Sequence, residues 1–328
     1  MPTPTPDPRS GYVPRAAVRR RRPAQAARAR TNLAELTARL TPRDVWLTEI
    51  LHEHKVLTSH HIAQLAFGGG HRTANRRLRE LYFLGLVDSF RPLRQTGSAP
   101  EHYTLGKAGA ELLAARAGVE PAATGWRKDS CARIAFSPTL EHTLGVNALL
   151  VTLAVTRRLP IWLSERSATR LWGDWTRPDA YAHCAAPSGQ LLPFFLEYDT
   201  GSYNLARLES KLPGYAALAS TTGTRTPLLI HTRTTRRETA LRRRLAPSAG
   251  QLGLLVATGN AELAAPDAAA WLPMDSVPST RLDLTQLTTH WPHLTPALTP
   301  DTTLPAPGRR AALPWRPIPP LPPDEERP

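Results

Sequence analysis

The order of apolar and polar positions predicts helices and then a pair of short strands in the first third of the chain. In three segments apolar residues recur every three or four positions, the spacing that places them on one face of a helix. Thr41 and Pro42 give the first helix an N-cap and a favoured first residue. Alternating residues then indicate two strands, and one more helix follows. The predicted helices span 41–54, 57–67, 71–86 and about 107–116, and the strands span 87–91 and 102–105.

From Ser137 the pattern changes to strands that alternate with helices. A long helix is followed by three strands, a helix, a strand, a basic helix and a last strand. This order is expected of one mixed sheet flanked by helices. We therefore predict an α/β (α+β) fold whose second domain is built on this sheet. The predicted strands span 160–165, 176–184, 190–199, 227–232 and 252–258, and the helices span 137–155, 202–218 and 234–246.

Proline is concentrated at the two ends of the chain. The 33 prolines crowd the first 23 residues and the stretch from Pro292 onward, where "LPWRPIPPLPPDEERP" is typical of extended polyproline II rather than of a core. We expect both ends to be disordered, with folded domains between them. The expected parts are a basic arm at 1–38, a first domain at 39–122, a second domain at 130–275 and a proline-rich tail at 276–328.

The charge of the chain favours a nucleic acid partner. The net charge is +14, and residues 1–30 hold eight arginines and one acidic residue, Asp7. Codon bias explains why the chain uses arginine rather than lysine, but it does not explain the excess of basic over acidic residues. A basic arm of this kind can follow a phosphate backbone, so DNA is the first partner to consider.

Other classes of protein find little support. Cys131 and Cys184 are the only cysteines and have no CxxC spacing, which offers neither a disulfide framework nor a cysteine zinc site. No stretch approaches 18 apolar residues, and the basic N-terminus lacks the apolar segment of a secretory signal. We therefore expect a cytoplasmic protein without a membrane-spanning segment.

Three helices followed by two strands is the layout of a winged helix, whose third helix enters the major groove of DNA. Arginine, threonine and asparagine on the outer side of that helix are residue types that contact phosphates and base edges. The alternative is a winged helix that binds protein, with a basic face that is only solvated. The expected DNA contacts are Arg72, Thr73, Asn75, Arg76, Arg77 and Arg79 on the third helix, with Arg91 and Arg94 in or beside the strand pair.

Histidines are frequent in the same domain. "HEHKV" is not an HExxH motif, and no cysteine lies nearby, so we assign no metal to them. We expect them to be surface residues of a DNA-binding module. They are His52, His54, His60, His61 and His71.

Three acidic residues fall where two neighbouring strands would bring them together. Asp179 lies in "RPDA", and Glu197 and Asp199 end the strand of "FFLEYDTGS". Three carboxylates at strand ends can hold Mg²⁺, which prefers oxygen ligands and would remove their mutual repulsion. Lys211 on the following helix could face the same site. Alternatively, Asp199 caps that helix, and Glu197 pairs with Arg207 or Arg177.

The motifs "RPDA", "FFLEYDTGS" and "RLESKLPGY", with "EHTLGVN" upstream, resemble the replication-relaxation family of actinobacterial plasmids and mobile elements. The resemblance covers roughly residues 40 to 275. It implies a winged helix joined to a domain similar to the PD-(D/E)xK nucleases.

By this resemblance Asp179 matches the first acid of the nuclease motif and Glu197 the second, whereas Asp199 stands in place of the usual lysine. Lys211 or Arg207 would then supply the cation from the helix, or catalysis has been lost. Glu141 or Glu165 could add the further acid that some nucleases of this kind use.

Two main hypotheses remain open at this stage. The first is a DNA-processing protein of the plasmid replication type, a Mg²⁺-dependent endonuclease or nickase that uses Asp179, Glu197, Asp199 and Lys211. The second is a non-enzymatic replication initiator or transcriptional regulator with an inactive nuclease-like domain. A weaker third hypothesis is an adaptor whose proline-rich tail recruits replication or conjugation proteins.

Overall fold

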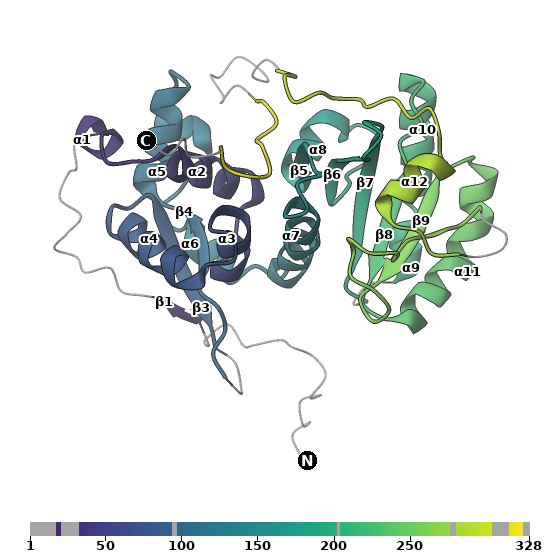
Figure 1. The fold of residues 1–328 in the computed structure, drawn as a ribbon, viewed down its shortest axis with the longest axis horizontal. Helices are drawn as coiled ribbons and strands as arrows, with labels where there is room; N and C mark the ends of the chain where they lie inside the picture. Colours follow the sequence, from purple (N-terminus) through teal and green to yellow (C-terminus); the bar gives the residue numbers. More distant parts are fainter. Residues whose placement is uncertain are drawn as a thin grey trace, which may run out of the picture.

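The chain folds into two domains that share a central helix. The first domain is mostly helical and the second is built on a six-stranded sheet, with α7 (Leu140–Ala154) lying between them (Figure 1). This mixed α/β architecture confirms the predicted fold class. The residues that the computed structural model describes are 18–20, 33–93, 97–201, 204–275, 280–303 and 315–323.

The first domain has three helices followed by an antiparallel strand pair, in the predicted order. Thr41 and Thr58 cap the first two of these helices with reciprocal side-chain and backbone hydrogen bonds. Four strands form the sheet, in the order β1-β3-β4-β2. The elements are β1 (Val18–Arg20), α1 (Leu33–Thr37), α2 (Pro42–His54), β2 (Leu57–Thr58), α3 (Ser59–Ala66), α4 (His71–Phe83), β3 (Val87–Pro92), β4 (His102–Leu105), α5 (Lys107–Arg116), η1 (Pro121–Thr124) and α6 (Ser130–Ala135).

The second domain follows the predicted order but contains elements that the sequence pattern did not indicate. Its sheet has the order β10-β9-β8-β7-β6-β5, in which β7, β8 and β9 are parallel and the other pairs antiparallel. The elements that were not foreseen are α8, which begins directly after β5, the short edge strand β10 and α12. The elements are β5 (Ile161–Ser164), α8 (Glu165–Trp172), β6 (Ala180–Ala185), β7 (Leu191–Asp199), α9 (Leu205–Glu209), α10 (Leu212–Thr222), β8 (Leu228–Thr232), α11 (Thr235–Gln251), β9 (Val256–Asn260), β10 (Leu272–Pro273) and α12 (Leu284–His290).

The two faces of this sheet pack on different helices, because successive side chains of a strand point to opposite sides. On β7, Phe194 and Leu196 belong to the core that contains α7 and α12, whereas Phe195 belongs to the core that contains α8, α10 and α11. Glu197 therefore points to the side of α10, and Tyr198 points to the side of α7. This alternation decides which helix each residue at the end of β7 meets.

A buried polar cluster fastens the first domain to the second. Glu53, 3 % exposed at the end of α2, accepts hydrogen bonds from the Ser164 backbone N–H (2.9 Å) and hydroxyl (2.8 Å) and from the Ser167 hydroxyl (2.7 Å). The carboxylate thus satisfies donors at the N-terminus of α8, where the helix dipole also favours negative charge. Burial disfavours the ionised carboxylate, but charge interactions with His54 and Arg166, together with these hydrogen bonds, outweigh it, so the pKa of Glu53 is lowered.

The histidines of the first domain do not all lie on the surface, so that expectation is wrong in part. His54 is 1 % exposed and stacks on Trp162 of β5, with ring centroids 3.9 Å apart. His52 contacts the Thr124 carbonyl oxygen through Nε2 at 3.0 Å and Arg166 through Nδ1 at 3.1 Å. Both rings belong to the contact between the domains. His60 and His71 are exposed, as predicted.

The boundaries predicted for the two unpacked ends also need correction. β1 pairs with β3, so residues 18–20 of the expected arm join the first sheet. Residues 33–37 of that arm form α1, whose Leu36 is buried in the core, and residues 1–17 and 21–32 lie outside the described residues. At the other end, α12 packs on β6 and β7. Residues 276–279, 304–314 and 324–328 of the expected tail lie outside the described residues. A proline-rich composition predicts an extended backbone. It does not tell whether the apolar side chains of the segment pack against the folded domains.

The described part of the C-terminal segment, residues 315–323, contacts both domains. Trp315 donates its indole N–H to the Ser167 hydroxyl at 2.8 Å, and the Trp46 indole N–H donates to the Pro319 carbonyl at 2.8 Å. Because Ser167 also donates to Glu53, three segments far apart in sequence meet at one hydroxyl. Nowhere in the described ranges is a helix both long and apolar enough to cross a lipid bilayer.

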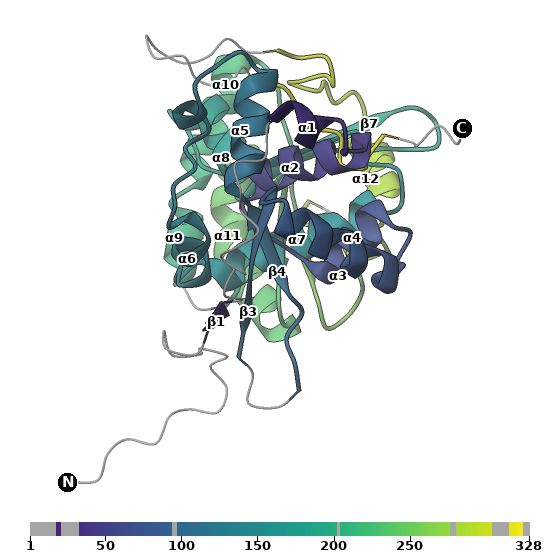
Figure 2. The same ribbon diagram turned by 90° about the vertical axis from the view of Figure 1, so that its left-hand side faces the viewer.

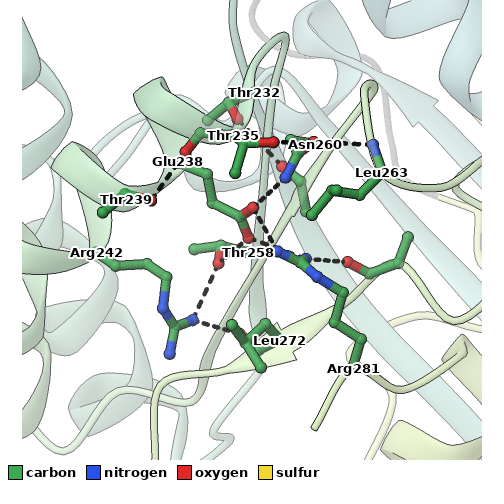
Figure 3. Close-up of polar contacts among 12 residues, drawn as sticks. Thr232, Thr235, Glu238, Thr239, Arg242, Thr258, Asn260, Leu263, Leu272 and Arg281 are labelled. Carbon is green, nitrogen blue, oxygen red and sulfur yellow. Dashed lines mark hydrogen bonds and ion pairs between the residues drawn. The ribbon is translucent and has the colours of Figure 1, made fainter. Parts of the chain in front are cut away.

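A buried ion pair between Glu238 and Arg281 shows that the folded domain extends beyond residue 275 (Figure 3). Glu238 of α11 is 2 % exposed and accepts two hydrogen bonds from Arg281, at 3.1 and 2.7 Å, one on each carboxylate oxygen. It also accepts from the Thr258 hydroxyl at 2.6 Å and from the Asn260 amide. Arg281 in turn donates to the Ala270 carbonyl at 2.6 Å. The second domain therefore includes residue 281 as a structural part.

We predict that Arg281→Met lowers the free energy of unfolding by about 3 kcal/mol, because it leaves the Glu238 carboxylate buried without its cation. Urea unfolding followed by circular dichroism measures this change. Arg243→Met, which removes an exposed arginine from the same helix as Glu238, is the matched control and should change stability by less than about 0.5 kcal/mol. Equal effects of the two substitutions would contradict the structural role of Arg281.

Candidate functional site

A pocket lies at the carboxyl end of β7, where the chain leaves the sheet. Its volume is about 380 Å³, and its walls come from the start of α7, from β7 and from α9. We call it the β7 pocket. It is lined by all four predicted site residues of the second domain, Asp179, Glu197, Asp199 and Lys211. The structure thus brings together what the sequence predicted to be close.

Glu197 is the most deeply held of these residues. It is 4 % exposed, and the Lys211 ammonium donates to both of its oxygens, at 2.8 and 2.7 Å. The Tyr215 hydroxyl donates to Oε1 at 2.6 Å. Because Lys211 and Tyr215 are four residues apart at the start of α10, they lie on the same face of the chain there. The alternative pairing of Glu197 with Arg207 or Arg177 is wrong.

Local packing places Lys211 over this carboxylate. The predicted helix 202–218 is interrupted, and Lys211 is the residue that precedes α10. Its ammonium also donates to the Arg177 carbonyl at 2.9 Å. Gly214 sits so close to the chain opposite that a Cβ there would lie 2.2 Å from the Trp175 carbonyl oxygen. Only glycine lets the first turn of α10 approach that loop, and this close approach keeps Lys211 within reach of Glu197.

Asp179 is held from the other face of the sheet by a residue that sequence reasoning did not single out, His142 of α7. The His142 Nε2 lies 3.2 Å from Asp179 Oδ1, and the Tyr198 backbone N–H donates to Oδ2 at 2.8 Å. The signal was present in the sequence as the His of "EHTLGVN". Its contact with Asp179 could not be foreseen, because 37 residues separate the two in the sequence.

The same helical motif supplies three further contacts. Gly145 packs directly on Tyr198, where a Cβ would lie 2.3 Å from the tyrosine ring. The Asn147 amide donates to the backbone carbonyls of His54 (3.2 Å) and Val56 (2.7 Å) in the first domain. Glu141, proposed from sequence as a further acid, pairs with Arg233 at the pocket rim. α7 therefore links the pocket to the first domain by direct hydrogen bonds.

Asp199 has a different partner from Glu197, although both lie on the same side of β7. Arg237 of α11 donates to its two oxygens, at 2.6 and 3.2 Å, and the Gly201 backbone N–H donates at 2.9 Å. Asp199 therefore does not cap the helix after Gly201, because Asn204 caps α9 instead.

The three carboxylates as arranged do not fit one shared magnesium ion. Each has its own cationic or hydrogen-bonding partner: Lys211 for Glu197, Arg237 for Asp199 and His142 for Asp179. In the described part of the chain, no three His, Cys, Asp or Glu side chains are grouped so that they could hold a metal. The like-charge repulsion is thus relieved by side chains from three different helices.

The pKa values of Glu197 and Asp179 are shifted in opposite directions. Burial and the nearby charge of Asp179 raise the pKa of Glu197 to about 7, although Lys211 opposes this rise. Burial also disfavours ionised Asp179, but its hydrogen bond and charge interaction with His142 outweigh it, so the pKa of Asp179 is lowered. An ionised Asp179 beside a Glu197 that can exchange a proton near neutral pH is an arrangement suited to acid–base chemistry.

A second hollow, in the first domain, collects four of the predicted DNA contacts. Asn75, Arg76 and Arg79 of α4 and Arg91 of β3 line a groove of about 580 Å³ between α4 and the strand pair. We call it the α4–hairpin groove. The β3–β4 hairpin that forms one wall projects from the body of the domain in both views (Figures 1 and 2). Arg91 is held in place by Glu101, 3.0 Å from its Nε.

The remaining predicted contacts are placed differently. Arg77 points inward: its guanidinium donates to both oxygens of Asp44, which is 2 % exposed, and to Glu80 at 2.7 Å. It fastens α4 to α2 and does not line the groove. Arg72 and Thr73 are exposed at the start of α4 but also lie outside the groove lining. Arg94 lies outside the described residues.

Comparison with known proteins gives one match. A family model described as Replication-relaxation matches residues 49–232, more than half of the chain. The matched region contains the α4–hairpin groove, Asp179, Glu197, Asp199 and Lys211, and it ends before Arg237. No curated protein and no solved structure matches the chain significantly.

We predict that the contribution of Glu197 to stability falls as the pH rises from 4.5 to about 7, because Glu197 ionises in this window only at a cost in the folded state. Buried histidines whose pKa is lowered to about 4, such as His52 and His54, have the opposite effect, so the contribution of Glu197 is read from the difference between the chain and Glu197→Gln. The raised pKa of Glu197 contributes stability that is complete below pH 4.5 and is lost as the pH passes about 7. We expect this contribution to change by about 3 kcal/mol over the window, measured by urea unfolding of both proteins at each pH. The control Asp199→Asn should show the same dependence of stability on pH as the unsubstituted chain. An unchanged slope in Glu197→Gln would contradict the assignment.

Proposed function

Because the chain belongs to the replication-relaxation family, we propose that it binds duplex DNA through the α4–hairpin groove and acts in plasmid replication or relaxation. The observation that carries this proposal is the convergence of Asn75, Arg76, Arg79 and Arg91 on one groove. Winged-helix proteins bind DNA with a helix followed by a β-hairpin, and the helix enters the major groove as the recognition helix.

The roles of the groove residues follow from their chemistry. Asn75 and Arg76, in the first half of α4, have side chains that can read base edges, asparagine at adenine and arginine at guanine. Arg79 and Arg91 lie further along the groove and are suited to phosphate contacts, which set affinity and register. Arg77 supports the recognition helix from behind by its bond to Asp44.

We propose as a second function that the β7 pocket cleaves or nicks DNA. Asp179, Glu197 and Lys211 line one pocket and are similar in type to the two acids and the lysine of PD-(D/E)xK nucleases. In this proposal Asp179 and Glu197 would hold Mg²⁺, and Asp199 would not. The ion would polarise a phosphodiester and lower the pKa of its bound water. Lys211 would stabilise negative charge on the phosphate.

A non-enzymatic DNA-binding protein, an initiator or a regulator, is the competing proposal. It is favoured by the close pairing of Lys211 with Glu197, since a metal ion would have to compete with an ammonium already at 2.7 Å. In that case the buried ion pair would serve only the stability and shape of the second domain. DNA binding is common to both proposals, so the two are separated by a cleavage assay.

We predict that Arg76→Ala weakens binding to duplex DNA about tenfold and lowers the slope of log affinity against log salt by about 1. Fluorescence anisotropy over a salt series measures both quantities. Arg243→Ala removes the same charge from α11, far from the groove, and should leave the affinity within about twofold.

Arg77→Met gives the sharper control, because it should lower stability while the folded protein keeps its affinity for DNA. If Arg77→Met weakens DNA binding as much as Arg76→Ala does, the α4–hairpin groove is not the contact surface.

We predict that the protein with Mg²⁺ converts supercoiled plasmid to open circles, and that Asp179→Asn and Glu197→Gln each reduce this rate at least about a hundredfold. Agarose gel electrophoresis follows the products. Asp199→Asn should keep most of the activity, because its carboxylate pairs with Arg237. DNA binding without any open-circular product, in Mg²⁺ and in Mn²⁺, would refute the nuclease proposal and leave the non-enzymatic one.

A further inference from the structure

A third hollow lies where the two domains and the C-terminal segment meet. Its volume is about 680 Å³, within the size range of small-molecule sites, and its walls come from α2, α5, α8 and residues 315–318. In both views α5 and α8 lie toward the end of the molecule opposite to β1 and β3 (Figures 1 and 2). The hollow is therefore separate from the α4–hairpin groove, and it shares no lining residue with the β7 pocket.

This hollow has more positive than negative charge. Four arginines from three elements line it, facing two glutamates, and Glu53 is already occupied by Ser164 and Ser167. Glu49 is shared at long range, 4.0 Å from Arg116 and 3.9 Å from Arg316. The arginines are Arg116, Arg166, Arg170 and Arg316.

The neighbouring titratable groups offset this charge only in part, with Glu53 lying 3.8 Å from Arg166. Burial and then the charge of Arg166 lower the pKa of His52 to about 4, so that its ring is neutral at pH 7. Burial raises the pKa of Glu49, which makes it a poorer counter-ion for the two arginines beside it. Arg166 and Arg170 are one helical turn apart on α8, and like charges at that spacing repel. An anion entering the hollow would remove this repulsion.

Part of the remaining lining is apolar. Leu113 of α5 and Ile318 and Trp315 of the C-terminal segment form this part. The Trp315 indole is fixed by its hydrogen bond to Ser167, so the wall does not need to be ordered by a ligand. An apolar wall next to convergent guanidinium groups matches a ligand with a flat ring at one end and phosphate at the other, since guanidinium binds phosphate with paired hydrogen bonds.

We propose that this interdomain arginine pocket binds a nucleotide, with its phosphates on the arginines and its base against the apolar wall. The site goes beyond DNA binding and cleavage. Because both domains and the C-terminal segment form its walls, a bound nucleotide stabilises the contact between them. Ligand that binds only the folded chain raises its melting temperature with ligand concentration.

The test is isothermal titration calorimetry on the full chain at low salt, with ADP, adenosine and inorganic phosphate as separate ligands. ADP should bind and also raise the melting temperature, and each of the other two should bind at least about tenfold more weakly, since each offers only half of the contacts. Arg316→Gln should weaken ADP binding about tenfold through the loss of a charge-assisted hydrogen bond. Arg316 has an exposed side chain, so its replacement should not disturb folding.

Arg243→Gln, which removes one exposed charge from α11, is the matched control and should leave ADP binding unchanged. The proposal is overturned if ADP produces no binding heat at millimolar concentration, or if inorganic phosphate binds as tightly as ADP. It is also overturned if Arg316→Gln and Arg243→Gln have equal effects, since binding would then follow net charge rather than this pocket.

Discussion

The packing of α7 between the first domain and the six-stranded sheet is the constraint on which the rest of the structure depends. One face of this helix meets α3, and the other meets β7, so a single hydrophobic core runs through both domains. Its polar residues add specific contacts at each side: Asn147 to the backbone of the first domain and His142 to Asp179. Since Gly145 lets Tyr198 lie directly on the helix, a larger residue there would push β7 and the pocket away.

The second feature that shapes the molecule is the way in which like charges are separated. Three carboxylates near the end of β7 are each met by a side chain from a different helix, α7, α10 or α11. The sheet makes this possible, because alternate residues and neighbouring strands open to different helices. Glu197 and Asp179 remain close enough to influence each other, and burial together with the charge of Asp179 raises the pKa of Glu197 to about 7.

The contact between the two domains also depends on a buried carboxylate that is held by side chains from distant segments. Glu53, Ser164 and Ser167 form a buried polar centre, and Trp315 from the C-terminal segment joins it at the Ser167 hydroxyl. Because these bonds join α2, α8 and the C-terminal segment, the first domain with its α4–hairpin groove is held at a defined position relative to the β7 pocket. The interdomain arginine pocket lies beside the same centre, which places a ligand there in contact with both domains.

The sequence by itself determined most of the elements and much of the candidate site. The helix start at Thr41 and the strand pair follow from caps and periodicity, which act over a few residues. The nearness of Asp179, Glu197 and Lys211 follows from the order of strands and helix. Other outcomes required the tertiary structure. Arg77 turns inward because Asp44 is buried against it, Asp199 pairs with an arginine 38 residues away, and Arg281 completes a domain that composition ended at 275. Which residues become partners depends on how distant segments pack together, because burial makes an unpaired charge costly. No local sequence pattern contains this information.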